Sequence, residues 1–142
     1  MAKYIQHTIY GLINVYLIQK EEYVKNPKYC EKGDILFAIT GENVEDIGKS
    51  WAYIGQEKCL VGGDIVVMKH NQNPKYIAYA LSTENARMQK SKGKIKSKVV
   101  HSNVPSIKEI RIPLPSLPEQ EKIVKILDEL QKSTMNLYRI LC

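Results

Sequence analysis

Short apolar stretches, separated by glycines and polar residues, run through the first half of the chain. The stretch DILFAIT, residues 34–40, is rich in β-favouring residues and lies between Gly33 and Gly41. This pattern is typical of a buried strand. The stretches SWAYIG and KCLVGGDIVVMK predict two or three further strands, with a turn or bulge at Gly62–Gly63. The segment IYGLINVYLI near the N-terminus predicts a strand or a strand pair.

The hydrophobic period changes in the second half of the chain. Ile77, Leu81 and Met88 recur at helical spacing, and Pro74 stands where a helix commonly begins. We therefore expect one helix over about residues 75–90. A short helical turn and then a strand, EIRIPL, are expected next, and the prolines that follow end this strand.

The C-terminus predicts a long helix over residues 116–142. Ser116 and Glu119 have the spacing of a capping box, and neither Gly nor Pro occurs after Pro118. A helix of 25 residues is about 37 Å long, which is more than a small domain easily covers. It therefore either folds back on its own domain or, as we favour, pairs with a helix of a second copy or another subunit. The expected pairing residues have heptad spacing: Ile123, Leu127, Leu130, Thr134, Leu137 and Leu141.

Length and composition describe an ordinary domain with one modest core. The chain has 142 residues, of which 44% are apolar, and no apolar run approaches the ~20 residues that span a bilayer. Three scattered cysteines suit a reduced cytosolic compartment, and the three histidines have no second ligand at metal spacing. We therefore expect a cytoplasmic protein with no membrane span, no metal and no cofactor.

The net charge of +6 is concentrated in the segment RMQKSKGKIKSK, residues 87–98. The other 15 basic residues of the chain balance its 15 acidic residues. Such a cluster predicts a polyanion site, with nucleic acid as the first candidate. A solvated loop, or a surface for an acidic protein or a membrane, remains an alternative. The basic residues of the cluster are Arg87, Lys90, Lys92, Lys94, Lys96 and Lys98.

Two motifs suggest enzymes at first, and neither holds. TGENVEDIGKS, residues 40–50, ends in Gly-Lys-Ser, but six residues separate its glycines where a phosphate-binding loop has four. A strand pattern follows it, whereas that loop requires a helix. NPKY, at residues 26–29 and 73–76, has Lys where adenine methyltransferases have Pro, and a turn before a strand or helix explains both copies. We expect no catalytic activity.

Three pieces in order carry a family resemblance: KGDILFAITGENVEDIGKSWAYIG, PKYIAYALST with the basic segment, and IKEIRIPLPSLPEQEKIVKILDEL. They resemble the specificity subunit of type I restriction-modification systems over about residues 20–135. The motif IPLPSLPEQEKIVKILD is similar to the family's junction between a target recognition domain and its helical spacer. There, Pro-Leu-Pro, Glu-Gln and an Ile-Val pair recur. KGDILFAITG resembles the family's central strand.

The resemblance implies an α+β fold. A mixed, twisted β-sheet with peripheral helices would form a target recognition domain over residues 1–115, and residues 116–142 would form a coiled-coil-like spacer. In the family, two such domains are held apart by an antiparallel helical pair, and each reads one half of a bipartite site in double-stranded DNA. The subunit docks methylation subunits, which bind S-adenosylmethionine, and through them a restriction subunit. It has no catalysis of its own.

The chain departs from the family pattern in having one recognition domain, no opening segment with a Trp, and a shorter helix. We therefore expect a half subunit that dimerises, a silent or truncated cassette, or a fragment. The other reading is an RNA-binding or protein-docking module that uses the same basic loop.

The predicted DNA contacts fall into two roles, binding of phosphates and reading of bases. Lys49 and Ser50 are expected to hold a phosphate, and the clustered lysines give affinity through counterion release. Trp51 fits the core better than a base contact. Base reading requires side chains that make directed hydrogen bonds in the major groove. The candidates are Arg87, Gln89, Ser97, His101, Ser102 and Asn103.

Overall fold

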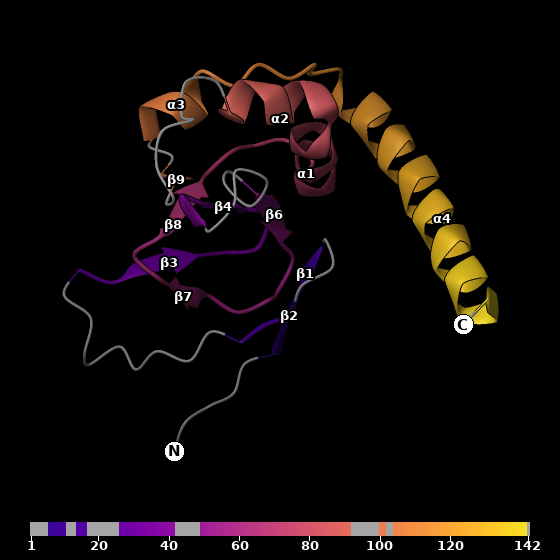
Figure 1. Cartoon of the computed structure of the whole chain (residues 1–142), viewed down its shortest axis with the longest axis horizontal. Coiled ribbons are helices and arrows are strands. Elements are labelled where there is room, and N and C mark those ends of the chain that lie inside the picture. Colours follow the sequence, from indigo (N-terminus) through magenta and orange to yellow (C-terminus); the bar gives the residue numbers. More distant parts are fainter. Residues whose placement is uncertain are drawn as a thin grey trace.

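The computed structural model describes residues 6–10, 14–16, 26–41, 49–91, 100–101 and 104–141. In these residues the main sheet has five strands in the order β2-β1-β6-β4-β8, and neighbouring strands run antiparallel (Figure 1). The strands of this sheet are β1 (Gln6–Tyr10), β2 (Asn14–Tyr16), β4 (Ile35–Ala38), β6 (Ser50–Tyr53) and β8 (Ile65–Met68). Two ladders accompany it, β3 (Lys28–Cys30) with β7 (Cys59–Val61) and β5 (Thr40–Gly41) with β9 (Val100–His101).

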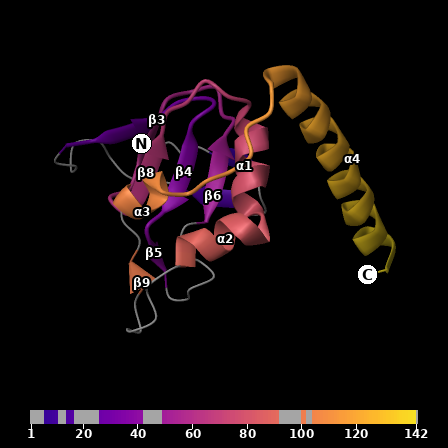
Figure 2. The same cartoon turned by 90° about the horizontal axis from the view of Figure 1, so that it is seen from above.

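The helices lie outside the sheet, as the expected α+β fold with peripheral helices requires. Helix α1 packs on the sheet, α2 follows it after a short break, and α4 projects from the body of the molecule (Figures 1 and 2). Their bounds are Pro74–Ser82 for α1, Glu84–Ser91 for α2, Val104–Lys108 for α3 and Leu117–Leu141 for α4.

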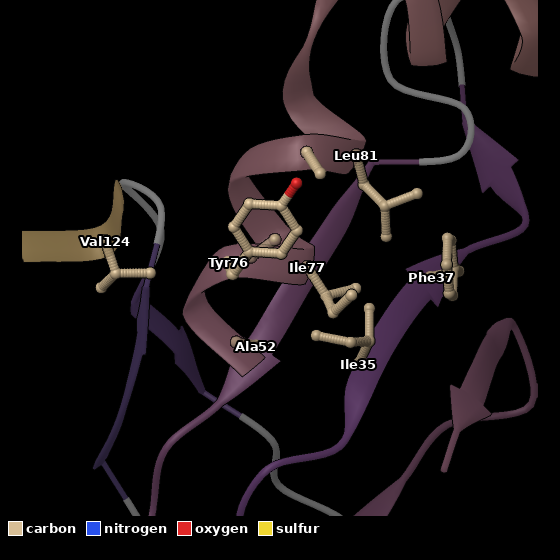
Figure 3. Packing of buried hydrophobic residues seen from close by; sticks show 9 residues of the cluster. Ile35, Phe37, Ala52, Tyr76, Ile77, Leu81 and Val124 are labelled. Carbon is tan, nitrogen blue, oxygen red and sulfur yellow. The ribbon is translucent and has the colours of Figure 1, made fainter. Parts of the chain in front are cut away.

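Strand β4 is apolar along its whole length because both of its faces are covered. Ile35 and Phe37 point toward α1, where they pack with Ile77 and other buried side chains of the first core cluster (Figure 3). Leu36 points the other way and packs with the β3–β7 ladder in a second cluster, against which Trp51 also packs. The continuous apolar run that predicted a buried strand therefore reflects two cores on opposite sides of one strand, and Trp51 contributes to the core as predicted.

The predicted single helix over residues 75–90 is two helices, because Thr83 interrupts it. Thr83 is extended, with φ −63° and ψ 153°, and its N–H and hydroxyl both donate to the Ala80 carbonyl. The same hydroxyl accepts from the Ala86 N–H at 3.4 Å, so Thr83 caps the end of α1 and the start of α2. The signal in the sequence was a Ser-Thr pair followed by Glu, which is a typical helix start.

The predicted strand EIRIPL is also wrong, because residues 109–116 form neither strand nor helix. The backbone of Arg111 forms hydrogen bonds with a side chain instead of with a neighbouring strand. The Arg111 N–H donates to Gln89 Oε1 at 2.8 Å, and Gln89 Nε2 donates to the Arg111 carbonyl at 2.9 Å. One amide side chain thus satisfies both polar groups that a strand would offer to a ladder.

Both NPKY copies are structural turns, as expected. The first leads into β3, with Asn26 in the left-handed region at φ 60°. In the second, the Asn73 side chain accepts from the Tyr76 N–H at 3.1 Å and Pro74 begins α1. This is an Asn N-cap followed by a proline in the first turn.

Candidate nucleic-acid interface

The β5–β9 ladder joins two segments that lie far apart in the sequence. Thr40 pairs with His101, and Gly41 pairs with Val100. The chain leaves β5 after Gly41 and enters β9 at Val100, so residues 42–48 and 92–99 connect to the ladder at the same end. Gly41 and Val100, the described residues next to the glycine-flanked loop and the basic segment, are therefore neighbours although 58 positions separate them in the sequence.

Lys49 and Ser50 lie at the end of the main sheet where β4 ends and the chain continues into β5. The Ala38 N–H donates to the Lys49 carbonyl at 3.0 Å, and Ser50 begins β6 opposite Phe37 of β4. Two residues after Ala38 the chain enters β5. The Lys49 side chain is exposed and Ser50 is half-buried. The Gly-Lys-Ser motif thus leads into a strand rather than a helix, as the rejection of a phosphate-binding loop required.

Helix α2 carries the first part of the basic segment and lies across this end of the sheet (Figure 2). Arg87 is exposed, and Lys90 lies on the last turn of the helix. Gln89 is half-buried, and its amide is held by Arg111 and by Asn85, whose Oδ1 accepts from Gln89 Nε2 at 2.9 Å. Both Nε2 hydrogens are thereby used, so reading of a base by Gln89 would require these bonds to break.

The remaining predicted contacts lie wholly or partly outside the described residues. Of His101, only the backbone in β9 is described. The positions outside the described ranges are Lys92, Lys94, Lys96, Ser97, Lys98, Ser102 and Asn103.

The predicted pairing face of α4 is partly covered by the domain and then becomes exposed. Ile123 and Leu127 are half-buried, whereas Leu130 and Leu137 are each 59% exposed and Thr134 is exposed as well. Leu141 ends the helix, and its side chain is not described. Two large leucine side chains on the distal half of α4 thus face solvent in this single chain.

Sequence reasoning missed Gln120, which is the buried polar centre of the junction between α1 and α4. Its side chain is 0% exposed and makes three hydrogen bonds to residues outside its own helix. The signal was the Glu-Gln pair inside the motif that carried the family resemblance. A glutamine early in an exposed helix gives no periodic hint of burial.

The other polar residues in the interior support the fold. Asp34 is buried, accepts from the Glu31 N–H at 2.7 Å and pairs with Lys69 Nζ at 2.6 Å, which raises the Lys69 pKa. Cys30 faces Cys59 across the β3–β7 ladder, and burial followed by the charge of Cys59 raises the pKa of Cys30 to about 12. Burial also raises the pKa of Cys59, so both thiols stay protonated, which is the less nucleophilic form. Across the described ranges, no three metal-binding side chains form a cluster and no helix is long and apolar enough to cross a membrane.

Comparison with known families shows the family to which the chain belongs. A family described as the type I restriction modification DNA specificity domain matches residues 3–139, nearly the whole chain. The chain belongs to this family. No curated protein matches it at a significant level. The resemblance inferred from the Pro-Leu-Pro, Glu-Gln and Ile-Val motif is thereby confirmed.

As a type I DNA specificity domain, the chain belongs to the part of restriction-modification systems that recognises DNA sequence. The match includes the basic segment, the β5–β9 ladder and most of α4.

Proposed function

We propose that the chain binds double-stranded DNA sequence-specifically as a half specificity subunit and directs partner methylation and restriction subunits to its site. The observation that carries this proposal is the family match across nearly the whole chain. On this proposal the chain acts in the cytoplasm, has no catalysis of its own and leaves S-adenosylmethionine to the methylation subunit.

The arrangement of the sheet supports DNA binding at the end where β6 begins. Lys49 and Ser50 enter β6 there, and the segment with Lys92, Lys94, Lys96 and Lys98 runs between α2 and β9. Cations grouped at one end of a rigid scaffold neutralise several phosphates of one duplex, which gives affinity without sequence preference. Arg87 on α2, His101 in β9 and Asn103, two positions further along the chain, are the candidates for contacts with base edges.

The exposed half of α4 supports helix pairing. A leucine that is 59% exposed gains about 1–2 kcal/mol when the exposed part is buried, so Leu130 and Leu137 favour a partner helix. Pairing of two copies would place two recognition ends under twofold symmetry and give a twofold-symmetric DNA target.

The decisive experiment is selection from a random-sequence duplex DNA library, with the purified chain alone and with a methylation subunit of a type I system. The proposal expects enrichment of a defined motif, sharper when the methylation subunit is present, together with co-purification of the two proteins. Filter binding to RNA of matched length serves as the comparison. Equal or tighter binding of RNA, with no DNA motif enriched, would identify an RNA-binding module instead, and binding of neither nucleic acid would favour a protein-docking module.

A further inference from the structure

The direction in which α4 leaves the domain is set mainly by polar contacts. Among the described residues of α4, only Gln120 and Val124 are buried, and Ile123 packs partly against the first core cluster. So small an apolar contact orients a 25-residue helix weakly, because hydrophobic burial has no directional preference. Hydrogen bonds with fixed geometry must therefore supply the orientation.

Gln120 supplies the first fixed point. Its Oε1 accepts from the Asn73 N–H at 3.0 Å, and its Nε2 donates to Gln72 Oε1 and to the Pro115 carbonyl, each at 2.8 Å. Asn73 is the N-cap of α1, so a single side chain connects the start of α1, the start of α4 and the proline turn between them. Both amide hydrogens and one acceptor position are used, and all are buried.

Asp128 supplies the second fixed point, eight residues or about 12 Å further along the helix axis. Its Oδ2 accepts from Lys75 Nζ at 2.6 Å, and its Oδ1 accepts from the Tyr79 hydroxyl at 2.8 Å. Lys75 and Tyr79 lie one turn apart on α1, which packs on the main sheet. Two attachments to one helix define the direction of α4 relative to that sheet, and the rest of α4 makes a lever beyond them (Figure 2).

We propose that Gln120 is a positioning residue that, together with Asp128, fixes the angle between α4 and the recognition domain and so sets the separation of DNA half-sites. This inference rests on the proposed function. The lever from Gln120 to Leu141 is about 32 Å long, so a tilt of about 10° at the junction displaces its end by about 5 Å. One base-pair step along DNA is about 3.4 Å, so such a tilt shifts the register by more than one base pair.

The angle is followed as a distance between two spin labels, measured by double electron–electron resonance. The labels are attached at two exposed positions, Asp64→Cys in the turn before β8 and Lys132→Cys on α4. The labelled protein is the full chain with Cys142→Ser, and Cys30 and Cys59 resist labelling because they are buried. We expect a narrow distance distribution in this chain, a broad one in Gln120→Leu and an intermediate one in Asp128→Asn. Matched controls are the exposed neighbours Glu121→Leu and Glu129→Gln, which should leave the distribution narrow.

The functional measurement is DNA binding to paired half-sites whose spacer is varied one base pair at a time. The unaltered chain should prefer one spacer length, and Gln120→Leu should bind several lengths within about threefold of one another while keeping its affinity for a single half-site. Unchanged distances and unchanged spacer preference in both variants would overturn the role of Gln120 and Asp128. If the unaltered chain binds no duplex DNA, the proposed function fails and the distance measurement alone decides the positioning role. If Gln120→Leu does not fold, Asp128→Asn, whose partners are partly exposed, carries the same test.

Discussion

The side-chain amide of Gln89 pairs with both backbone polar groups of Arg111. Gln89 Oε1 accepts from the Arg111 N–H at 2.8 Å, and Gln89 Nε2 donates to the Arg111 carbonyl at 2.9 Å. Through this pair, α2 holds the irregular segment that leads to α4, at the end of the sheet where the predicted DNA contacts lie. Gln89 therefore connects α2 with the segment that precedes α4.

Gln89→Glu should destabilise the fold by about 1–2 kcal/mol at pH 7, because the donor to the Arg111 carbonyl is lost and a carboxylate faces that oxygen. Urea unfolding followed by circular dichroism measures the loss. The difference in the free energy of unfolding should shrink as the pH falls through about 4, because the introduced carboxyl is then protonated and can donate a hydrogen bond. A deficit that is the same at pH 7 and pH 4 would contradict this role of the amide.

Replacement of Lys92, Lys94, Lys96 and Lys98 by Ala should weaken binding to all duplex DNA alike. The plot of log affinity against log salt becomes less steep by about 0.9 for each phosphate that a lysine no longer neutralises. Its steepness should therefore decrease by up to about 3.6. Filter binding over a salt series measures both the affinity and the slope. The control replaces Lys122 and Lys125, exposed on α4, by Ala and should bind like the unaltered chain. Intact affinity at moderate salt in the fourfold variant would disprove the assignment of the basic segment.

Glu119 should make the start of α4 sensitive to acid. Its carboxylate accepts from the Ser116 hydroxyl at 2.6 Å and from the Ser116 N–H at 3.0 Å, and these bonds lower its pKa below the ordinary 4.5. A lowered folded-state pKa gives stability that is present above pH 4.5 and is lost as the pH falls through the folded-state value. Glu119→Gln should therefore be less stable than the unaltered chain at pH 7, and the difference should vanish in acid.

Thermal unfolding at a series of pH values between 7 and 3 tests this dependence. The matched control is Glu121→Gln, the same change at an exposed neighbour on the same helix. Parallel pH profiles for the Glu119→Gln variant and the unaltered chain would show that the cap adds nothing.

Replacement of both Leu130 and Leu137 by Asp should abolish pairing through α4 while leaving the domain folded. Loss of the two leucines from a buried seam costs about 2–4 kcal/mol, which corresponds to an association weaker by about 30-fold or more. Sedimentation velocity over a concentration series measures the association, and circular dichroism checks the fold. Asn136→Asp introduces a single negative charge on α4 outside the heptad positions and should pair normally. Equal association of all three chains would show that another surface mediates any self-association.

Local patterns in the sequence determined the elements whose causes are local. The apolar run of residues 34–40 predicted β4, Ser116 and Glu119 predicted the start of α4, and the motif that follows predicted the family. These features depend on side-chain period and on caps that reach only a few residues along the chain.

The tertiary structure decided the features that depend on partners distant in sequence. The segment EIRIPL is irregular rather than a strand, and Gln89, 22 residues away, takes both backbone hydrogen bonds of Arg111 at its centre. Gln120 is buried because Gln72 and Asn73, 48 and 47 residues away, surround its amide. The pairing of Gly41 with Val100 joins two strands whose residues lie about 60 positions apart in the sequence. Hydrogen bonds of this range leave no periodic trace in the sequence, so only the folded chain reveals them.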